Sequence, residues 1–113
     1  MYRIIACGSD MSYNPATGAM RVAISDDIAK IIMGKSEMLP DKLLSWISFV
    51  DEDDFSGQQL LKIKEEINEL IERQLVTRRD VQDLLQLLQF AFDNNRDVVF
   101  TPFWHDDIPL AKF

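Results

Sequence analysis

Two stretches near the N-terminus carry the residue pattern of β-strands. Residues 2–8, YRIIACG, are a short, isoleucine-rich apolar run followed by turn residues, as a strand usually is. Residues 19–24, AMRVAI, alternate with the period of two that a strand requires. The turn formers NPATG stand between the two runs. The pattern therefore predicts a β-hairpin with a long loop.

Four later segments have the apolar pattern of helices. The first begins after Ser25, whose side chain can cap it, and is predicted to end at Gly34. The second is predicted near residues 41–49, after a proline suited to a first helical turn. The third and fourth cover residues 57–74 and 78–93. The apolar face of the last is broad enough for packing on two sides.

Capping-box spacing marks the starts of the last two helices. Ser56 stands three residues before Gln59, and Thr77 stands three residues before Asp80. In such a box the first side chain accepts a hydrogen bond from the backbone N–H three residues on, and the later side chain reaches back. We therefore expect Ser56 and Thr77 to cap their helices.

The C-terminal part returns to strand character in residues 98–104, VVFTPFW. Because Pro102 has no N–H to donate, this strand is expected to lie at a sheet edge or to end early. The 113 residues are the length of one domain. We predict a single α+β domain over residues 1–113, with a small, mainly antiparallel sheet packed against three to four helices.

Charge and composition narrow the classes of partner and the compartment. Nineteen acidic residues against twelve basic ones give a net charge of −7, which argues against direct binding to nucleic acid or to an anionic membrane. No apolar run reaches the roughly 20 residues that span a bilayer, and the N-terminus lacks signal-peptide features. The single cysteine, Cys7, fits a reducing compartment. We expect a cytoplasmic protein whose partner is basic; the sequence leaves its oligomeric state open.

Four consecutive acids, Asp51 to Asp54, stand in the stretch VDEDDFSG. A calcium loop of the EF-hand type is not expected, because Phe55 and Lys62 occupy positions that need oxygen ligands. The acids continue into the following helix, so we predict one negative sector that binds a basic protein. The predicted partner-binding residues are Asp51, Glu52, Asp53, Asp54, Phe55, Glu65, Glu66, Glu69 and Glu72. The alternative is a solvated loop that only complements the helix start.

Aromatic residues near the acids divide into two groups. Phe55 is taken as a partner contact, since aromatic anchors ringed by charge are typical of binding hot spots, whereas Trp46 and Phe49 are expected in the core. The cluster of Phe100, Phe103 and Trp104 is expected in the core or at an interface, because it lacks the basic frame of a base-stacking site.

No catalytic residue, metal site or cofactor is predicted. His105 is the only histidine, whereas a zinc site needs three or four ligands. The chain contains no nucleophile elbow and no glycine-rich phosphate loop. One rival hypothesis is a small enzyme with a shallow polar site near Asp10, His105 and Asp106. Another is a regulatory or structural subunit whose apolar surface is its interface.

A small acidic α+β chain without a catalytic set resembles the immunity proteins of bacterial toxin systems, including those of contact-dependent growth inhibition. The stretches VDEDDFSGQQLLKIKEEINEL and VVFTPF carry this resemblance. It implies a protein that binds a cognate toxin, often a nuclease, and blocks its active site or a nearby surface. It assigns no functional residue by position. Phage proteins that imitate nucleic acid share the same electrostatics.

Overall fold

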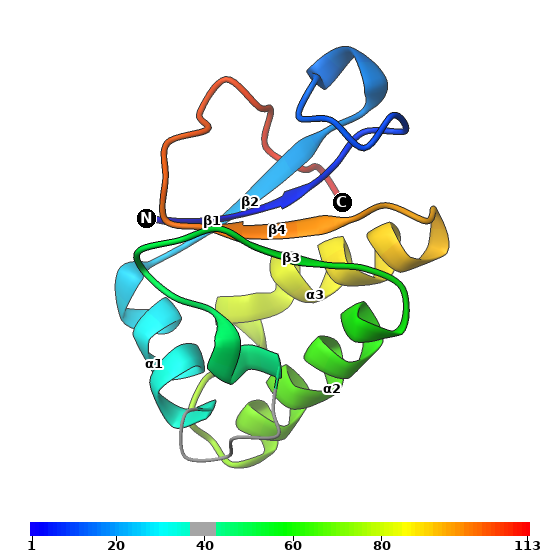
Figure 1. Ribbon diagram of the computed structural model, residues 1–113. Helices are drawn as coiled ribbons and strands as arrows, with labels where there is room; N and C mark the ends of the chain where they lie inside the picture. Colours follow the sequence, from blue (N-terminus) through cyan, green and yellow to red (C-terminus); the bar gives the residue numbers. More distant parts are fainter. Residues whose placement is uncertain (37–42) are drawn as a thin grey trace.

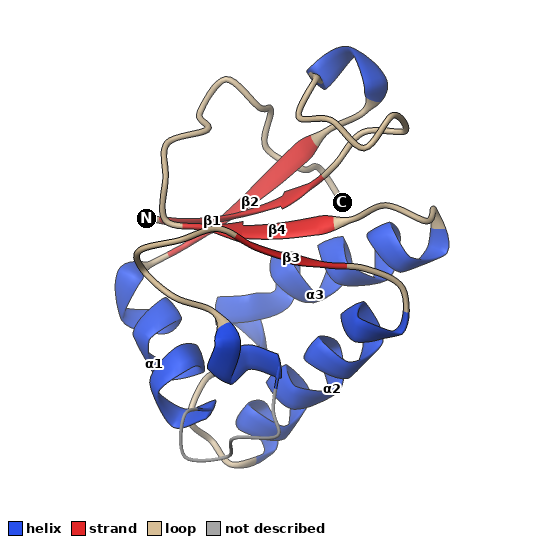
Figure 2. Ribbon diagram, viewed as in Figure 1, coloured by secondary structure: helices blue, strands red, loops and turns tan. Residues whose placement is uncertain are grey.

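The computed structural model describes residues 1–36 and 43–113 and has the predicted α+β fold, with the helices on one side of a sheet (Figure 1). Figure 2 shows the same arrangement by secondary structure. The strands are β1 (Tyr2–Ala6), β2 (Met20–Ile24), β3 (Asp53–Phe55) and β4 (Val98–Thr101). The helices are α1 (Asp26–Ser36), α2 (Gln58–Glu72) and α3 (Arg78–Asp93), with short 3-10 helices η1 (Pro15–Thr17) and η2 (Leu43–Trp46).

The sheet has the strand order β2-β1-β4-β3, and every neighbouring pair is antiparallel. The predicted hairpin is confirmed as β1 and β2, with Ile4 opposite Val22. β4 lies between β1 and β3, so of the two outcomes expected from Pro102 the edge position does not occur. Its early end is confirmed, because the strand stops at Thr101 and Pro102 has no ladder bond to donate.

The second half of the acidic run forms the edge strand β3 rather than a loop. Asp54 lies opposite Val99 and Phe55 opposite Val98 of β4. Local propensity disfavours Asp in a strand, so the pairing depends on β4, which is remote in sequence. Charged residues on an edge strand also discourage pairing with another chain.

The start of α1 and both ends of α3 follow the predictions, whereas the end of α1 does not. α3 covers the predicted residues, and Thr77 caps it: its Oγ1 accepts from the Asp80 N–H at 3.3 Å, and Asp80 Oδ2 accepts from the Thr77 N–H at 3.2 Å. α1 continues past Gly34 to Ser36, so its predicted end was wrong. An exposed glycine within a helix costs only about 1 kcal/mol, which packing offsets.

The predicted cap at Ser56 was also wrong. Gly57 is the N-terminal cap of α2, at φ 56° and ψ −131°, and no side chain caps the helix. Only the reverse half of the box is present, in which Gln59 Oε1 accepts from the Ser56 N–H at 3.0 Å. Glycine adopts this backbone conformation without strain. The turn that it makes leaves Ser56 one residue too early to act as the cap.

The helix predicted near residues 41–49 is largely replaced by η2 and a loop. Residues 41 and 42 lie outside the described residues, and the 3-10 helix ends at Trp46. The following N–H of Ser48 donates to Asp53 Oδ2 at 3.3 Å instead of continuing a helical ladder. A side-chain acceptor brought in by β3 thus competes with helix formation.

The main core lies between the helices and one face of the sheet. The apolar stripes of α2 and α3 pack against each other and against residues such as Ile4 and Phe100, whose ring meets Phe55 edge-on at 5.7 Å between centroids. α3 also packs against β1 and β2, which confirms its two-sided packing. Burial of each large apolar side chain contributes about 1.5–3 kcal/mol. In the described residues, no helix has the length and apolar character needed to cross a membrane.

The opposite face of the sheet carries a smaller apolar cluster beneath the 7–19 loop and the C-terminal segment. Ile5, Cys7, Val99 and Ile108 are buried there, and Tyr13 packs against them. The C-terminal segment follows the outer edge of β2: the Arg21 N–H donates to the carbonyl of residue 109 at 2.9 Å. One sheet edge is therefore covered, whereas the other is formed by the acidic strand β3.

Candidate functional site

Two loops meet at the end of the sheet where the N-terminus lies (Figure 1). The 47–52 loop leads into β3, and the 102–107 loop leaves β4. They are joined directly, because His105 Nε2 lies 2.9 Å from Glu52 Oε2. Residues about 50 positions apart therefore share one surface.

These loops expose several large apolar side chains. Val50 is 74% exposed and Trp104 is 79% exposed, with Phe49 and Phe103 also in solvent. Phe49 lines one hollow with Trp104 and another with Val50, and we call these three residues the aromatic face. The core location expected for Phe49 was wrong, as it was for Trp46, which is exposed on η2. Large apolar side chains gathered on a surface are typical of a binding site.

Two adjacent hollows shape the surface on either side of Phe49. One, of about 490 Å³, lies between Arg3, Phe49 and Trp104. The other, of about 380 Å³, lies between Met33, Phe49 and Val50. Lys30 lines both hollows together with Phe49. The aromatic face is therefore grooved, which allows a partner side chain to be enclosed rather than merely touched.

The 47–52 loop is fastened to the start of β1 by Tyr2. The Tyr2 hydroxyl donates to the Ser48 carbonyl at 2.9 Å, and its ring meets Phe49 edge-on at 5.4 Å between centroids. Burial raises the pKa of Tyr2 well above its usual value, and the charges of Asp53 and Glu52 add to the effect. The hydroxyl therefore stays protonated and able to donate at any physiological pH.

Arg3 fastens the 102–107 loop in the same way. Its Nε lies 3.2 Å from Asp106 Oδ1, and its guanidinium stacks over the Trp104 ring at 4.8 Å from the centroid. Arg3 is itself buried in β1, so this ion pair is shielded more than a fully exposed one. Neighbouring residues of one strand thus hold both loops.

The acids of the run have different roles. Asp51 and Asp54 are exposed, whereas Glu52 pairs with His105 and Asp53 accepts from Ser48. Partial burial is the main cause that raises the pKa of Asp53, and the charges of Asp51 and Asp54 raise it further against the opposing effect of the Ser48 N–H. Part of the run therefore organises the loop, and part remains available to a partner.

Two of the predicted partner-binding residues are buried and cannot form part of an exposed surface. Phe55 packs in the core against Phe100. Glu66 is 5% exposed and accepts from the N–H groups of Leu43 and Leu44, at 3.0 Å each. Its position within the apolar stripe of α2, three residues after Ile63, was the signal that could have identified it.

The remaining predicted residues lie on the outside of α2. Glu65 and Glu72 are exposed, and Glu69 pairs with Arg73 at 3.3 Å. α2 starts near the end of β3 and leads away from the sheet (Figure 1), so Glu72, its last residue, is far from the acidic run. The predicted continuous negative sector is thus divided into a run at the sheet edge and a row along α2.

The polar residues proposed for a rival enzyme site each have their own partners. Asp10 Oδ1 accepts from Ser12 and Thr17, which lowers its pKa, while Asp106 pairs with Arg3. His105 has the orienting carboxylate of a catalytic dyad in Glu52. In the described part of the chain, however, no hydroxyl or thiol is hydrogen-bonded to its ring. Nor do the described residues contain a group of three or more side chains suited to a metal.

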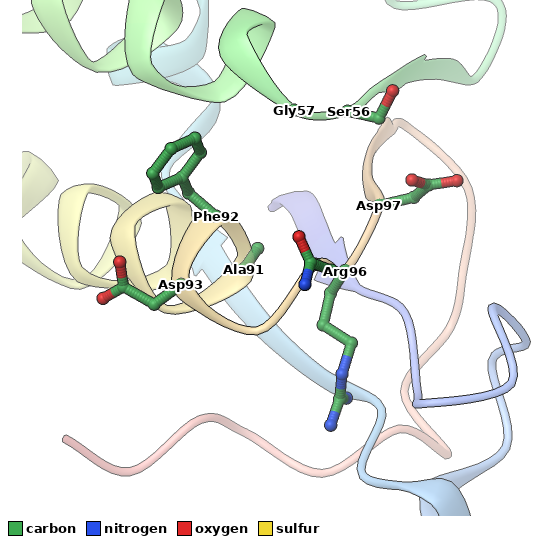
Figure 3. A pocket seen from close by; sticks show the side chains of 8 residues that line it. Ser56, Gly57, Ala91, Phe92, Asp93, Arg96 and Asp97 are labelled. Carbon is green, nitrogen blue, oxygen red and sulfur yellow. The ribbon is translucent and has the colours of Figure 1, made fainter.

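A further hollow, of about 460 Å³, lies between the start of α2 and the end of α3 (Figure 3). Asp93, Arg96 and Asp97 contribute charges of both signs. The guanidinium of Arg96 points away from Gly57 and Phe92 in Figure 3 and donates to the Cys7 carbonyl at 3.1 Å. The cation is therefore engaged outside the hollow, and the site offers little to an anionic ligand.

Comparisons of the chain with family models, with curated proteins and with solved structures each found no match. Function is therefore inferred from the geometry of the two loops and of the sheet edge.

Proposed function

We propose that this protein is a non-catalytic binding module, an immunity or inhibitor protein that neutralises a basic toxin such as a nuclease. The observation that carries the proposal is the aromatic face, held by two anchored loops beside the acidic run. In this proposal the aromatic side chains supply most of the affinity, and the acids supply orientation and a fast encounter.

The anchoring of the loops supports binding rather than incidental exposure. Tyr2 and Arg3 are buried, and each fixes one loop through a hydrogen bond or ion pair and a ring contact. Ordering a flexible side chain on binding costs about 0.5–1.5 kcal/mol. Aromatic groups that are already placed avoid part of this cost, so the arrangement suits a tight complex.

The charge around the aromatic face supports a basic partner. Asp51 and Asp107 are exposed on the two loops that carry it, as is Asp106, which pairs with Arg3, and the whole chain carries a net charge of −7. A nuclease needs a positive surface to contact phosphates. An acidic module with an aromatic anchor can occupy such a surface and exclude the substrate. This is also the mode of action that the resemblance to immunity proteins implies.

The proposal is tested by capture from a lysate of the source organism on three immobilised forms of the protein. The test variant is F49S/W104S, and the control is L110S/F113S, which removes two apolar side chains that are exposed outside the aromatic face. We expect one basic protein on wild type and on the control, reduced by at least tenfold on the test variant and released by high salt. Equal retention by all three forms would contradict the proposal.

One observation favours a small enzyme as the second candidate, namely the pairing of His105 with Glu52. Because the same pair links the two loops, it has a structural explanation as well. The variant H105N separates these roles: a binding module keeps most of its affinity for the captured partner, whereas a catalytic histidine loses its activity with little change in binding.

A further inference from the structure

The sheet face turned away from the helices carries a hollow of about 320 Å³. Cys7 and Val99 of the small apolar cluster line it, together with Met11 and Tyr13 from the 7–19 loop and the carboxylates of Asp54 and Asp97. Asp54 belongs to β3, and Asp97 immediately precedes β4. The hollow is thus built from the sheet edge that carries the acidic run.

Both carboxylates are available to a ligand. In the described part of the chain, neither the Asp54 nor the Asp97 side chain forms a hydrogen bond or an ion pair. Their negative charge raises the pKa of neighbouring groups. The pKa of Cys7 rises to about 11 through burial, then through Asp97 and Asp54, and that of Tyr13 rises to about 12 through burial, then through nearby charges that include Asp54. The two carboxylates therefore give the lining of the hollow a negative charge.

A second, independent observation is the Cys7 thiol. Cys7 is only 3% exposed and lines the hollow, yet among the described residues its side chain has no hydrogen-bonding partner. A thiol is a weak acceptor as well as a weak donor. This buried, unpartnered thiol is one of the groups that line the acidic hollow, and its sulfur can accept a weak hydrogen bond from a ligand that brings its own donors.

We propose that this hollow binds the guanidinium of one arginine side chain from the basic partner, a proposal that rests on the proposed function. A planar guanidinium has donors on several edges, so it can bond Asp54 and Asp97 together, which a single ammonium does less well. The Tyr13 ring supplies an aromatic surface, and Met11 supplies an apolar one for the methylene stem. Among the described residues, no group of three or more side chains is suited to a metal ion instead.

The hollow is linked to the 102–107 loop, which carries Trp104 of the aromatic face. The Tyr13 ring meets the His105 ring edge-on at 5.0 Å between centroids, and His105 in turn contacts Glu52 of the 47–52 loop. A partner seated on the aromatic face can therefore extend an arginine across the 102–107 loop into the hollow. The acidic run connects the aromatic face and the hollow along the chain: Asp51 directly follows Val50 of the aromatic face, and Asp54 lines the hollow.

The test is an NMR titration of the ¹⁵N-labelled protein with N-acetyl-arginine methylamide. The matched neutral probe is N-acetyl-citrulline methylamide, which has nearly the same shape without the charge. We expect saturable shifts centred on the amides of Cys7, Tyr13 and Val99 with the arginine probe only. The variant D54N/D97N should weaken this binding by at least tenfold. The control D27N/D83N has the same net charge and should bind within twofold of wild type.

Several outcomes overturn the proposal: no saturable shift, shifts spread over the acidic surface, equal binding of the citrulline probe, or equal binding by D54N/D97N and its control. If D54N/D97N does not fold, D54N alone is measured and should weaken binding by at least threefold. The titration needs no partner. If the arginine probe gives no response but the partner is still captured, arginine binding in the hollow is refuted and the proposed function stands. If the probe binds but no partner is captured, the proposed function alone is refuted.

Discussion

Glu66 offers the sharpest test of how the site is held in place. Its carboxylate is buried beneath η2, where one oxygen accepts from the Leu43 N–H and the other from the Leu44 N–H, at 3.0 Å each. The bond to Leu44 is fully buried, whereas the bond to Leu43 is partly exposed. η2 leads directly into the 47–52 loop, so the carboxylate on α2 positions the segment that carries Phe49.

The substitution Glu66→Gln keeps the size of the side chain and removes one acceptor. The amide can still accept from Leu44, but its NH₂ group then faces the Leu43 N–H, donor against donor. Hydrogen bonds to charged groups contribute about 1.5–3 kcal/mol each, so we expect a loss of about 2 kcal/mol. For a domain of this size that is a fall in Tm of about 8 °C. Glu66→Ala removes both acceptors and should cost more, about 3–5 kcal/mol.

The assay is urea unfolding followed by circular dichroism, with hydrogen exchange of the Leu43 amide as a local readout. The control is Glu65→Gln, the same chemical change one residue earlier at an exposed position, which should alter stability by less than about 0.5 kcal/mol. Exchange at Leu43 should accelerate in Glu66→Gln by more than the global loss of stability explains, because its N–H loses its acceptor. If the two variants unfold at the same urea concentration, the carboxylate does not hold η2, and the reasoning fails.

Three further predictions concern the cap, the acidic run and the thiol. Thr77→Ala should lower stability by about 1 kcal/mol in urea unfolding, whereas Ser56→Ala should leave it unchanged, because only the Thr77 side chain caps its helix; equal effects would contradict the assigned helix starts. The pKa of Asp53 is higher in the folded protein than in the unfolded chain, so its contribution to stability is lost as pH rises from the unfolded pKa through the folded pKa. Asp53→Asn should therefore gain stability over wild type from acid to neutral pH in melting curves, and a constant difference would be inconsistent with this. Cys7, with a pKa of about 11 and a buried side chain, should react with a thiol reagent at pH 8 far more slowly than the same thiol in urea; equal rates would show that it is exposed.

The local patterns of the sequence determined most of the secondary structure. The apolar spacing of α2 and α3 predicted both helices, and the Thr77 box predicted the start of α3, because each signal lies within a few neighbouring residues. The same holds for the hairpin of β1 and β2, whose turn formers and alternation are adjacent in the chain. The α+β class followed from the number and type of these elements.

The candidate site was predicted only in part. The sequence singled out the acidic run and the aromatic residues beside it as a candidate site because they are neighbours along the chain. The sequence did not show which of these aromatic residues face solvent, since Phe55 is in the core while Phe49 and Trp46 are exposed. Alternation along a segment shows that its residues have two sides, but the packing of other segments decides which side is buried.

Only the tertiary structure decided the features that depend on remote partners. Asp53 to Phe55 form a strand because β4 offers backbone groups to pair with, and that ladder outweighs the low strand propensity of aspartate. Glu66 is buried because η2 presents two N–H groups that need an acceptor. The 47–52 and 102–107 loops form one surface because neighbouring residues of β1, Tyr2 and Arg3, bind one loop each. These outcomes come from hydrogen bonds and contacts between residues far apart in the chain, and no local pattern encodes them.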